Sequence, residues 1–346
     1  MKRVMMLLAA VSAVGLLAAG QARADEPKEL LIYNWTDYTS PEMIKKFEAE
    51  TGIKVTLDTY DSNETLLAKL KAGGTGYDIV VPSSDFVPIL IKEGLIEQIE
   101  PNTLPNYKNV AANFKEEPWD PGNKYTIPWQ WGVTSFIYDT AVYKEPVDSL
   151  KTLFQPPPEL AGKVGMFGSP SEVINLALIS LGKPICSDDP ADLKAVSALL
   201  QEQKPAVKLY NSDGIKDRMV SGETAMHENW SGDALRSRLQ KPSLKFVFAK
   251  EGGIVWVDNL AVAKGAQHPE NAKKFMDFFM NPENAALETN FAGYQNAIDG
   301  NLKFVRKDYA ESPEFNPPAG YKTFFTKACS PEVTKAFDRI WTKLRQ

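Results

Sequence analysis

Apolar residues form two kinds of pattern along this chain: short continuous runs, and segments in which they recur every three or four positions. The runs at 30–33 and 79–81 are short and bounded, which is typical of strands buried on both faces of a parallel sheet. The segment 41–51 has the spacing of an amphipathic helix and begins with a capping serine followed by proline. The two patterns alternate from residue 30 to residue 94, and this order predicts β-α-β-α-β-α units of a parallel sheet.

The same alternation continues in the second half of the chain. We predict strands at 30–33, 53–57, 77–82, 127–138, 163–167, 225–229, 246–249 and 254–262, and helices at 41–51, 62–72, 87–93, 169–181, 189–203, 214–222, 230–239, 269–280 and 282–291. From residue 314 onward we expect a helical tail that ends in 332–344 and packs on the second half.

A chain of 346 residues is long enough for two domains. The element order predicts an α/β clamshell of two lobes, each a mixed sheet flanked by helices, joined by two hinge crossings near 138–139 and in 254–262. We expect the N-terminal lobe to comprise 25–137 plus 257–302, and the C-terminal lobe 138–256 plus 303–346. A ligand cleft should lie between the lobes, where strand-end loops meet.

Residues 1–24 have the three parts of a secretory signal peptide: basic Lys2 and Arg3, an apolar stretch at 4–20, and a small-x-small cleavage site at 22–24. The alternative is a membrane anchor, for which the stretch is marginal in length. We therefore expect export to the periplasm. Cleavage would make the chain more acidic than its formal charge of −5, which argues against nucleic acid and favours cationic ligands.

The chain contains two cysteines, Cys186 and Cys329, and two histidines, His227 and His268. In an oxidising compartment the two cysteines either form one disulfide or stay as two free or buried thiols, and the sequence leaves both possibilities open. The sequence contains neither a Cys/His cluster of the kind that binds zinc or copper nor a cofactor-binding motif. We therefore expect neither a metal nor a cofactor.

Tryptophans paired with carboxylates stand out at the predicted strand ends. Trp256 and Asp258 lie two residues apart on a strand and therefore share a side, and Trp230 and Asp233 lie three apart at a helix start. The candidate ligand-binding residues are Trp35, Thr36, Asp37, Ser83, Asp85, Glu172, Trp230, Asp233, Trp256, Asp258 and Tyr294. Indole rings attract cations and cover methylenes, and carboxylates provide the charge-assisted hydrogen bonds that an ammonium needs. This combination predicts a site for an alkylammonium ion.

An anion site is the opposite possibility, because predicted helix starts at 41, 84 and 170 point their positive ends toward the same cleft. Anion sites of this kind usually include an arginine, and no arginine lies in a candidate loop. The helix ends would then keep the carboxylates ionised.

Purely structural roles stay open for single residues. Each of the three tryptophans could belong to the core or to the rim of a cleft. Asp37 and Asp233 could cap helices, Glu172 could complete a capping box with Ser169, and Asp258 could brace the hinge.

Five motifs together resemble the periplasmic spermidine/putrescine-binding proteins of ABC transporters. They are 33–38, 47–55, 77–83, Trp230-x-Gly232-Asp233 and Trp256-x-Asp258, and the resemblance covers nearly the whole chain after the signal peptide. It implies a type II periplasmic-binding-protein fold, with a polyamine bound between the lobes and delivered to an inner-membrane permease. We expect the protein to be a monomer. We also expect no enzymatic activity, since the sequence offers no nucleophile–base pair.

The resemblance also implies roles for the candidate residues. Trp35 and Trp256 would sandwich the methylene chain, with Trp230 as a further wall. Asp258 and Glu172 would bind ammonium groups, Asp37 would lie beside the other terminus, and Asp233 matches an acid of the putrescine-preferring branch. Thr36, Ser83 and Tyr294 would be hydrogen-bonding contacts.

Two positions depart from the resemblance. Asp85 and Lys327 stand where relatives have uncharged residues. Either the two side chains pair with each other, or Lys327 binds a carboxylate of a zwitterionic or modified amine.

Three other functions stay open: a polyamine-sensing subunit of a membrane signalling protein, a metal-complex receptor and an enzyme. A metal-complex receptor usually has a tyrosine pair, and Tyr294 has no adjacent tyrosine partner.

Overall fold

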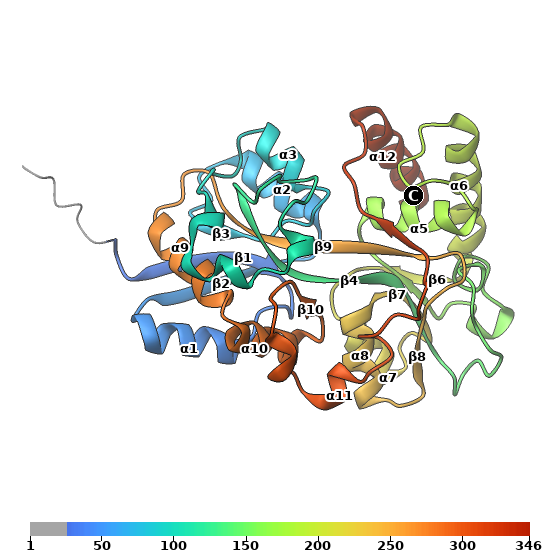
Figure 1. Cartoon of the computed structure of the whole chain (residues 1–346). Helices are drawn as coiled ribbons and strands as arrows, with labels where there is room; N and C mark the ends of the chain where they lie inside the picture. Colours follow the sequence, from blue (N-terminus) through green and yellow to red (C-terminus); the bar gives the residue numbers. More distant parts are fainter. Residues whose placement is uncertain (1–25) are drawn as a thin grey trace, which may run out of the picture.

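One mixed β-sheet runs through both lobes of the protein (Figure 1). The computed structural model describes residues 26–346, so the predicted signal peptide lies outside the described residues. The strands are β1 (Glu29–Trp35), β2 (Lys54–Tyr60), β3 (Ile79–Val80), β4 (Thr126–Asp139), β5 (Val164–Met166), β6 (Val207–Tyr210), β7 (Met226–Trp230), β8 (Leu244–Val247), β9 (Gly253–Val262), β10 (Gln295–Asn296) and β11 (Thr323–Phe325). The main path of the sheet is β2-β1-β3-β9-β4-β7-β5-β6.

Helices cover both faces of the sheet in each lobe (Figure 1). They are α1 (Pro41–Thr51), α2 (Asn63–Ala72), α3 (Val87–Lys92), α4 (Lys151–Phe154), α5 (Pro170–Ser180), α6 (Pro190–Gln203), α7 (Ile215–Ser221), α8 (Ser231–Gln240), α9 (Pro269–Phe279), α10 (Pro282–Ala292), α11 (Lys307–Ala310) and α12 (Pro331–Arg345). In the first lobe α2 and α3 lie on one side of the strands and α1 and α10 on the other. The predicted two-lobe α/β architecture is confirmed.

The first lobe begins with the predicted parallel unit. β1 pairs in parallel with both β2 and β3, and β9 is antiparallel to β3. The side chain of Ser40 caps α1 by accepting the N–H of Met43 at 3.2 Å, and Gly52 ends the helix in the left-handed conformation. Because β1 and β3 are parallel, their carboxyl ends open at the same edge of the sheet.

Two long strands, β4 and β9, pass from one lobe into the other (Figure 1). In β4, Trp129 packs in the core of the first lobe and Phe136 in the core of the second. In β9, Ile254 belongs to the second core and Val257 to the first. The polypeptide therefore crosses between the lobes within these strands. The exact residue boundaries of the lobes, 25–137 plus 257–302 and 138–256 plus 303–346, stay a prediction.

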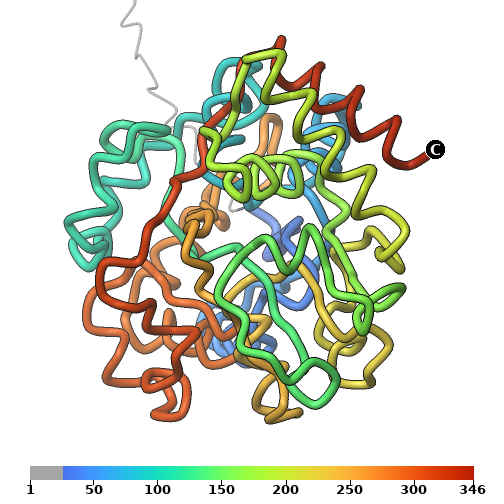
Figure 2. The backbone as a smooth tube through the Cα atoms, turned by 90° about the vertical axis from the view of Figure 1, so that its right-hand side faces the viewer, coloured from blue at the N-terminus to red at the C-terminus, as the bar shows by residue number. Residues whose placement is uncertain are grey.

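The C-terminal segment corrects the expectation of a helical tail from residue 314. Residues 323–325 form β11, which pairs in parallel with residues 253–255 of β9, and the helix begins only at Pro331. This strand depends on a distant partner, the edge of β9, and such pairing leaves no periodic pattern in the segment itself. The final helix α12 packs on α5 and α6 of the second lobe, as expected (Figures 1 and 2).

A disulfide joins Cys186 to Cys329, with 5.2 Å between their Cα atoms. Of the two possibilities that the sequence left open, the disulfide is therefore the one present. It fixes the segment before α12 to the loop that connects α5 and α6.

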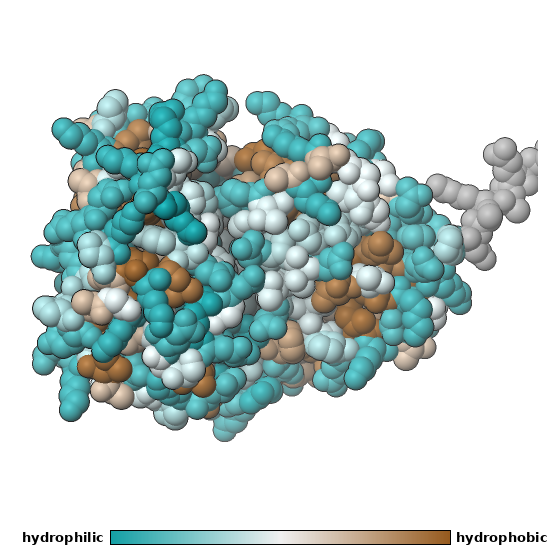
Figure 3. Space-filling view, turned by 180° about the vertical axis from the view of Figure 1, so that it is seen from behind, coloured by the Kyte–Doolittle hydropathy of each residue, from teal (hydrophilic) through white to brown (hydrophobic). Residues whose placement is uncertain are grey.

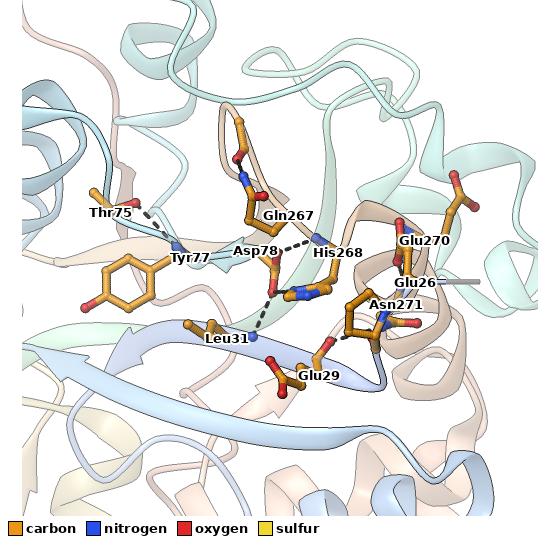
Figure 4. Close-up of polar contacts among 12 residues, drawn as sticks. Glu26, Glu29, Leu31, Thr75, Tyr77, Asp78, Gln267, His268, Glu270 and Asn271 are labelled. Atoms are coloured by element: carbon orange, nitrogen blue, oxygen red, sulfur yellow. Dashed lines mark hydrogen bonds and ion pairs between the residues drawn. The ribbon is translucent and has the colours of Figure 1, made fainter. Parts of the chain in front are cut away.

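A buried polar network holds the start of β1 to α9 (Figure 4). Asp78 accepts the backbone N–H groups of Leu31 and His268, at 2.9 and 2.7 Å, and contacts the His268 ring at 3.0 Å. The side chain of Asn271 donates to the carbonyl of Glu29 at 3.0 Å. His268 is thus part of the framework of the first lobe.

The surface seen from behind is mainly hydrophilic, and hydrophobic residues form small groups between polar ones (Figure 3). Within residues 26–346, no helix combines the length and the apolar character that crossing a membrane requires.

Candidate ligand-binding cleft

A cavity of about 910 Å³, counted together with its opening, lies between the two lobes. All eleven candidate residues line it: Trp35, Thr36, Asp37, Ser83, Asp85, Glu172, Trp230, Asp233, Trp256, Asp258 and Tyr294. Sequence reasoning missed other lining residues, among them Tyr38, Tyr60, Ser171, Lys216, Arg236 and Thr326. The cavity therefore collects side chains from at least six elements of both lobes.

The elements explain why these side chains meet. Trp35 ends β1, and Ser83 and Asp85 follow β3, so they extend from the carboxyl ends of parallel strands. Trp256 and Asp258 point from β9 toward the same side, as their spacing predicted. The second lobe contributes the first turns of α5 and α8, with Glu172 and Asp233, and the end of β7, with Trp230.

The aromatic walls are fixed by neighbours behind them. The indole N–H of Trp35 donates to the carbonyl of Val81 at 2.9 Å, and the ring meets that of Trp230 edge-on, with 6.5 Å between centroids. Trp230 stacks on Phe167 at 4.3 Å. The contacts with Val81 and Phe167 each lie within one lobe, so they fix the orientation of each ring without a ligand, which reduces the entropy cost of binding.

Two glycines make room for the remaining rings. A Cβ atom on Gly132 of β4 would lie 2.7 Å from the Trp256 ring and 3.0 Å from Tyr294. A Cβ atom on Gly232 of α8 would lie 2.6 Å from the same tyrosine. Trp256 and Tyr294 are 5.2 Å apart between centroids and pack edge to face. Their position depends on the absence of side chains at these two glycines.

Asp258 is buried and is 4% exposed. Its carboxylate accepts the hydroxyl of Ser83 at 2.5 Å. Burial raises the pKa of Asp258 to about 7, while the hydrogen bond from Ser83 and the nearby Tyr38 hydroxyl oppose the rise. A cation beside this carboxylate would restore its charged form.

Glu172 accepts the indole N–H of Trp230 at 2.9 Å and the hydroxyl of Thr134 at 3.3 Å. Its carboxylate therefore faces the cavity. The capping-box alternative is not what the structure shows, because the hydroxyl of Ser169 bonds to Glu64 and caps no N–H of α5. Burial raises the pKa of Glu172 to about 8, and the nearby charges of Glu64 and Asp85 add to the effect.

Asp85 lies close to these acids. Burial raises its pKa to about 7, and the charges of Glu64 and Asp258 raise it further. The possible pair with Lys327 is absent from the ion pairs of residues 26–346, in which Lys327 is exposed and does not line the cavity. That expectation is corrected, since the tail takes an extended path and presents Thr326 to the cavity instead.

The acids on the other side of the cavity have basic partners. Arg236 donates to the Asp233 carboxylate at 2.5 Å and to the backbone carbonyl of Asp37 at 3.2 Å. Lys216 lies 3.7 Å from the Asp37 carboxylate, which is 62% exposed at the cavity mouth. No arginine lies in a candidate loop, but Arg236 reaches the cavity from α8. The spacing of three residues between Asp233 and Arg236 on one helix could have indicated the pair.

Contacts across the cleft also join the lobes near α2 and α5. The Ser171 hydroxyl donates to the Glu64 carboxylate at 2.9 Å, and Ser169 contacts the same carboxylate at 3.3 Å. Burial raises the pKa of Glu64. No ion pair involves Glu64, Asp85, Glu172 or Asp258 anywhere in the described part of the chain. The same residues also contain no group of three acidic, cysteine or histidine side chains arranged to hold a metal.

Comparison with known proteins gives the same architecture. Residues 42–317 match the family described as bacterial extracellular solute-binding protein. The chain belongs to this family of solute-binding proteins. A putrescine/agmatine-binding protein of Pseudomonas aeruginosa is 30% identical, over 100% of this chain and 99% of the relative. The spermidine/putrescine-binding periplasmic protein of Escherichia coli is 35% identical, over 89% of each chain.

Among solved structures, the substrate-binding protein PotD of a spermidine/putrescine ABC transporter from Streptococcus pneumoniae superposes on this solute-binding protein with a TM-score of 0.76. It is 28% identical, and the match covers 92% of this chain and 99% of that one. The periplasmic binding protein AgtB of A. tumefaciens, solved in complex with agropinic acid, has a TM-score of 0.71 at 19% identity and shares the fold alone. These relatives confirm the type II periplasmic-binding-protein fold and the family resemblance.

Proposed function

We propose that this solute-binding protein captures a polyamine of the putrescine or spermidine class between its lobes. The observation that carries the proposal is the set of three carboxylates, Asp85, Glu172 and Asp258, that line an aromatic cavity without a basic partner among residues 26–346. Buried acids of this kind cost free energy unless a cation joins them. The polyamine-binding names of the two similar proteins agree with this chemistry.

The cavity suits the other parts of a polyamine as well. The rings of Trp35, Trp230 and Trp256 cover methylenes and attract ammonium groups by about 0.5–2 kcal/mol each. Asp258 and Glu172 would then accept ammonium N–H groups, and Ser83 and Tyr294 would provide further polar contacts. A ligand that touches both lobes stabilises the closed arrangement by its differential contacts.

The expected route of the ligand is delivery to an inner-membrane ABC permease after export of the protein to the periplasm. Signal cleavage after residue 24 would leave a mature chain that starts at Asp25. N-terminal sequencing of the secreted protein tests this part, since an intact residue 1 would contradict it. Stimulation of ATP hydrolysis by the permease in liposomes tests delivery.

Isothermal titration with putrescine, spermidine, cadaverine and agmatine tests the ligand. We expect saturable binding of at least one of them by the monomeric protein. The variant Asp258→Lys should abolish binding, because a fixed ammonium would replace that of the ligand. Asp148→Lys, at a side chain 75% exposed, is the control and should bind normally. Absence of binding for all four amines would overturn the proposal.

A further inference from the structure

The two ends of the cavity differ in how their carboxylates are neutralised. Asp258 and Glu172 accept hydrogen bonds only from uncharged donors, namely a serine hydroxyl, an indole N–H and a threonine hydroxyl. Asp233, in contrast, is bonded to the guanidinium of Arg236 at 2.5 Å, and both side chains are only 12% exposed. One end therefore needs a cation from the ligand, and the other already has one.

We propose that Arg236 is a specificity-determining residue that limits the requirement for an ammonium group to one end of the ligand. This inference rests on the proposed function and refines it. The ammonium end lies among Asp85, Glu172 and Asp258. The opposite end of the ligand meets the Asp233–Arg236 pair, where a hydroxyl or an amide is accepted as well as a second ammonium.

The contacts of Arg236 explain why a ligand cannot simply displace it. Besides Asp233, the guanidinium holds the backbone carbonyl of Asp37 at 3.2 Å, so it connects α8 of one lobe with the loop after β1 of the other. An ammonium at this place would lose its hydration and approach a guanidinium of like charge. A hydroxyl avoids both costs, because it can donate to Asp233 or accept from Arg236, whose buried Nε–H has no partner.

Lys216 adds to the asymmetry. Its ammonium lies 3.7 Å from the Asp37 carboxylate and lines the same side of the cavity. The same ammonium lies 4.0 Å from Asp217, which lines the cavity together with Asp213. Asp37 and Asp217 are 62% and 81% exposed, so among the described residues the more buried cavity acids without a basic partner are those of the Asp85–Glu172–Asp258 side.

The test compares putrescine with 4-aminobutan-1-ol, which has nearly the same length but replaces one ammonium by a hydroxyl. For the wild-type protein we expect the two Kd values to lie within about tenfold of each other. Both ligands place an ammonium among Asp85, Glu172 and Asp258, and the second ammonium of putrescine gains little beside the Asp233–Arg236 pair. Arg236→Gln leaves Asp233 ionised and unpaired, and it should increase the preference for putrescine by about tenfold or more. Arg236→Lys retains the positive charge and should keep the wild-type preference.

The preference, which is the ratio of the two Kd values, separates this role from a merely structural one. Loss of the Asp37 contact weakens lobe closure for both ligands alike and leaves the ratio unchanged. Asp233→Asn provides a second variant, since it leaves Arg236 unneutralised and should shift the ratio in the opposite direction, toward the amino alcohol. Circular dichroism of each variant checks folding.

The inference is overturned if the wild-type protein binds putrescine but rejects the amino alcohol by about a hundredfold or more. It is also overturned if Arg236→Gln leaves the ratio as it is. These results contradict the role of Arg236 and leave polyamine capture intact. If putrescine, spermidine, cadaverine, agmatine and the amino alcohol all fail to bind the wild-type protein, the proposed function fails with the inference.

Discussion

The indole N–H of Trp230 donates to the carboxylate of Glu172 at 2.9 Å. A ring that can cover methylenes and an acid that can bind an ammonium are thus connected directly, although 58 residues separate them in the sequence. The hydrogen bond opposes the rise in the pKa of Glu172 that burial causes. Trp230 can therefore affect cation binding in two ways: its ring face can cover the ligand, and its N–H, at the ring edge, helps to keep Glu172 ionised.

The first prediction concerns this edge. Trp230→Phe keeps an aromatic face but removes the N–H, so the pKa of Glu172 should rise further and a larger fraction of the acid should be protonated at pH 7. We expect putrescine affinity to fall by about tenfold at pH 7, because one hydrogen bond to a charged group is lost. The difference in affinity from wild type should be smaller at pH 9, where Glu172 is ionised in both proteins. Titration calorimetry at both pH values measures it. Trp341→Phe, on α12, is the matched control, and a deficit independent of pH would contradict the explanation.

The second prediction concerns Asp258, the most buried acid of the cavity. Asp258→Asn should weaken polyamine binding by about 1.5–3 kcal/mol, the value of a hydrogen bond to a charged group. In the absence of ligand the same variant should melt at a higher temperature than wild type at pH 8, because it removes an unpaired buried charge. Asp148→Asn serves as the exposed control. A lower melting temperature at pH 8 without ligand would argue against an uncompensated charge.

The third prediction is a pH dependence with opposite signs for folding and binding. Burial raises the pKa of Asp85 and Asp258 to about 7 and of Glu172 to about 8, whereas unfolded Asp and Glu titrate near about 4. Between these values the folded, ligand-free protein binds more protons than the unfolded chain, so its stability should decrease as pH rises from about 4 to about 8.

Binding follows the reverse trend because an ammonium favours the ionised acids. Polyamine affinity should increase from pH 6 to pH 8, and binding should release protons. Calorimetry in two buffers of different ionisation enthalpy counts the protons released. A heat of binding that is the same in both buffers at pH 7 would show that these acids are already ionised.

The fourth prediction addresses closure of the lobes. Ser171→Ala removes the 2.9 Å hydrogen bond to Glu64, a contact between α5 of one lobe and α2 of the other. Polyamine affinity should fall by about tenfold, since the closed state loses a bond to a charged group. Small-angle X-ray scattering should show a larger fraction of open protein at subsaturating ligand. Ser180→Ala, at the other end of α5, bonds only within its helix and should behave as wild type.

The fifth prediction concerns the Cys186–Cys329 disulfide, which joins residues 143 positions apart in the sequence. Replacing both cysteines by serine should lower the free energy of unfolding by about 2–5 kcal/mol. Urea unfolding of wild type with and without reductant provides the comparison, and reductant should not affect the double variant. An unchanged urea midpoint in the double variant would mean that the bond constrains little of the unfolded chain.

The sequence predicted the framework and the cavity residues because both depend on local patterns. The alternation of strands and helices up to residue 94 is visible in the spacing of apolar residues, and the pair Trp256–Asp258 follows from strand geometry alone. β11 escaped prediction because its only reason to be a strand is the edge of β9, about seventy positions earlier in the chain. Local spacing cannot report such a partner.

The charge state of the cavity was the hardest property to predict. Asp233 was expected to bind the ligand, yet its carboxylate forms an ion pair with Arg236, which lies three residues later on the same helix. Lys216 reaches Asp37 from the other lobe, a contact between residues far apart in the chain that local spacing does not reveal. The acids in strand-end loops therefore predicted residues that line the cavity, and the structure adds which of these acids have a basic partner.

Gly132 and Gly232 leave the space into which Trp256 and Tyr294 fit. Neither glycine has a side chain that could touch a ligand, yet both determine how far the two rings recede from the opposite wall. A single methyl group at either position would push aromatic surface forward and shorten the room for an aliphatic chain. Under the proposed function, the size of amine that fits can therefore be altered from behind the cavity, without changing any residue that a ligand would contact.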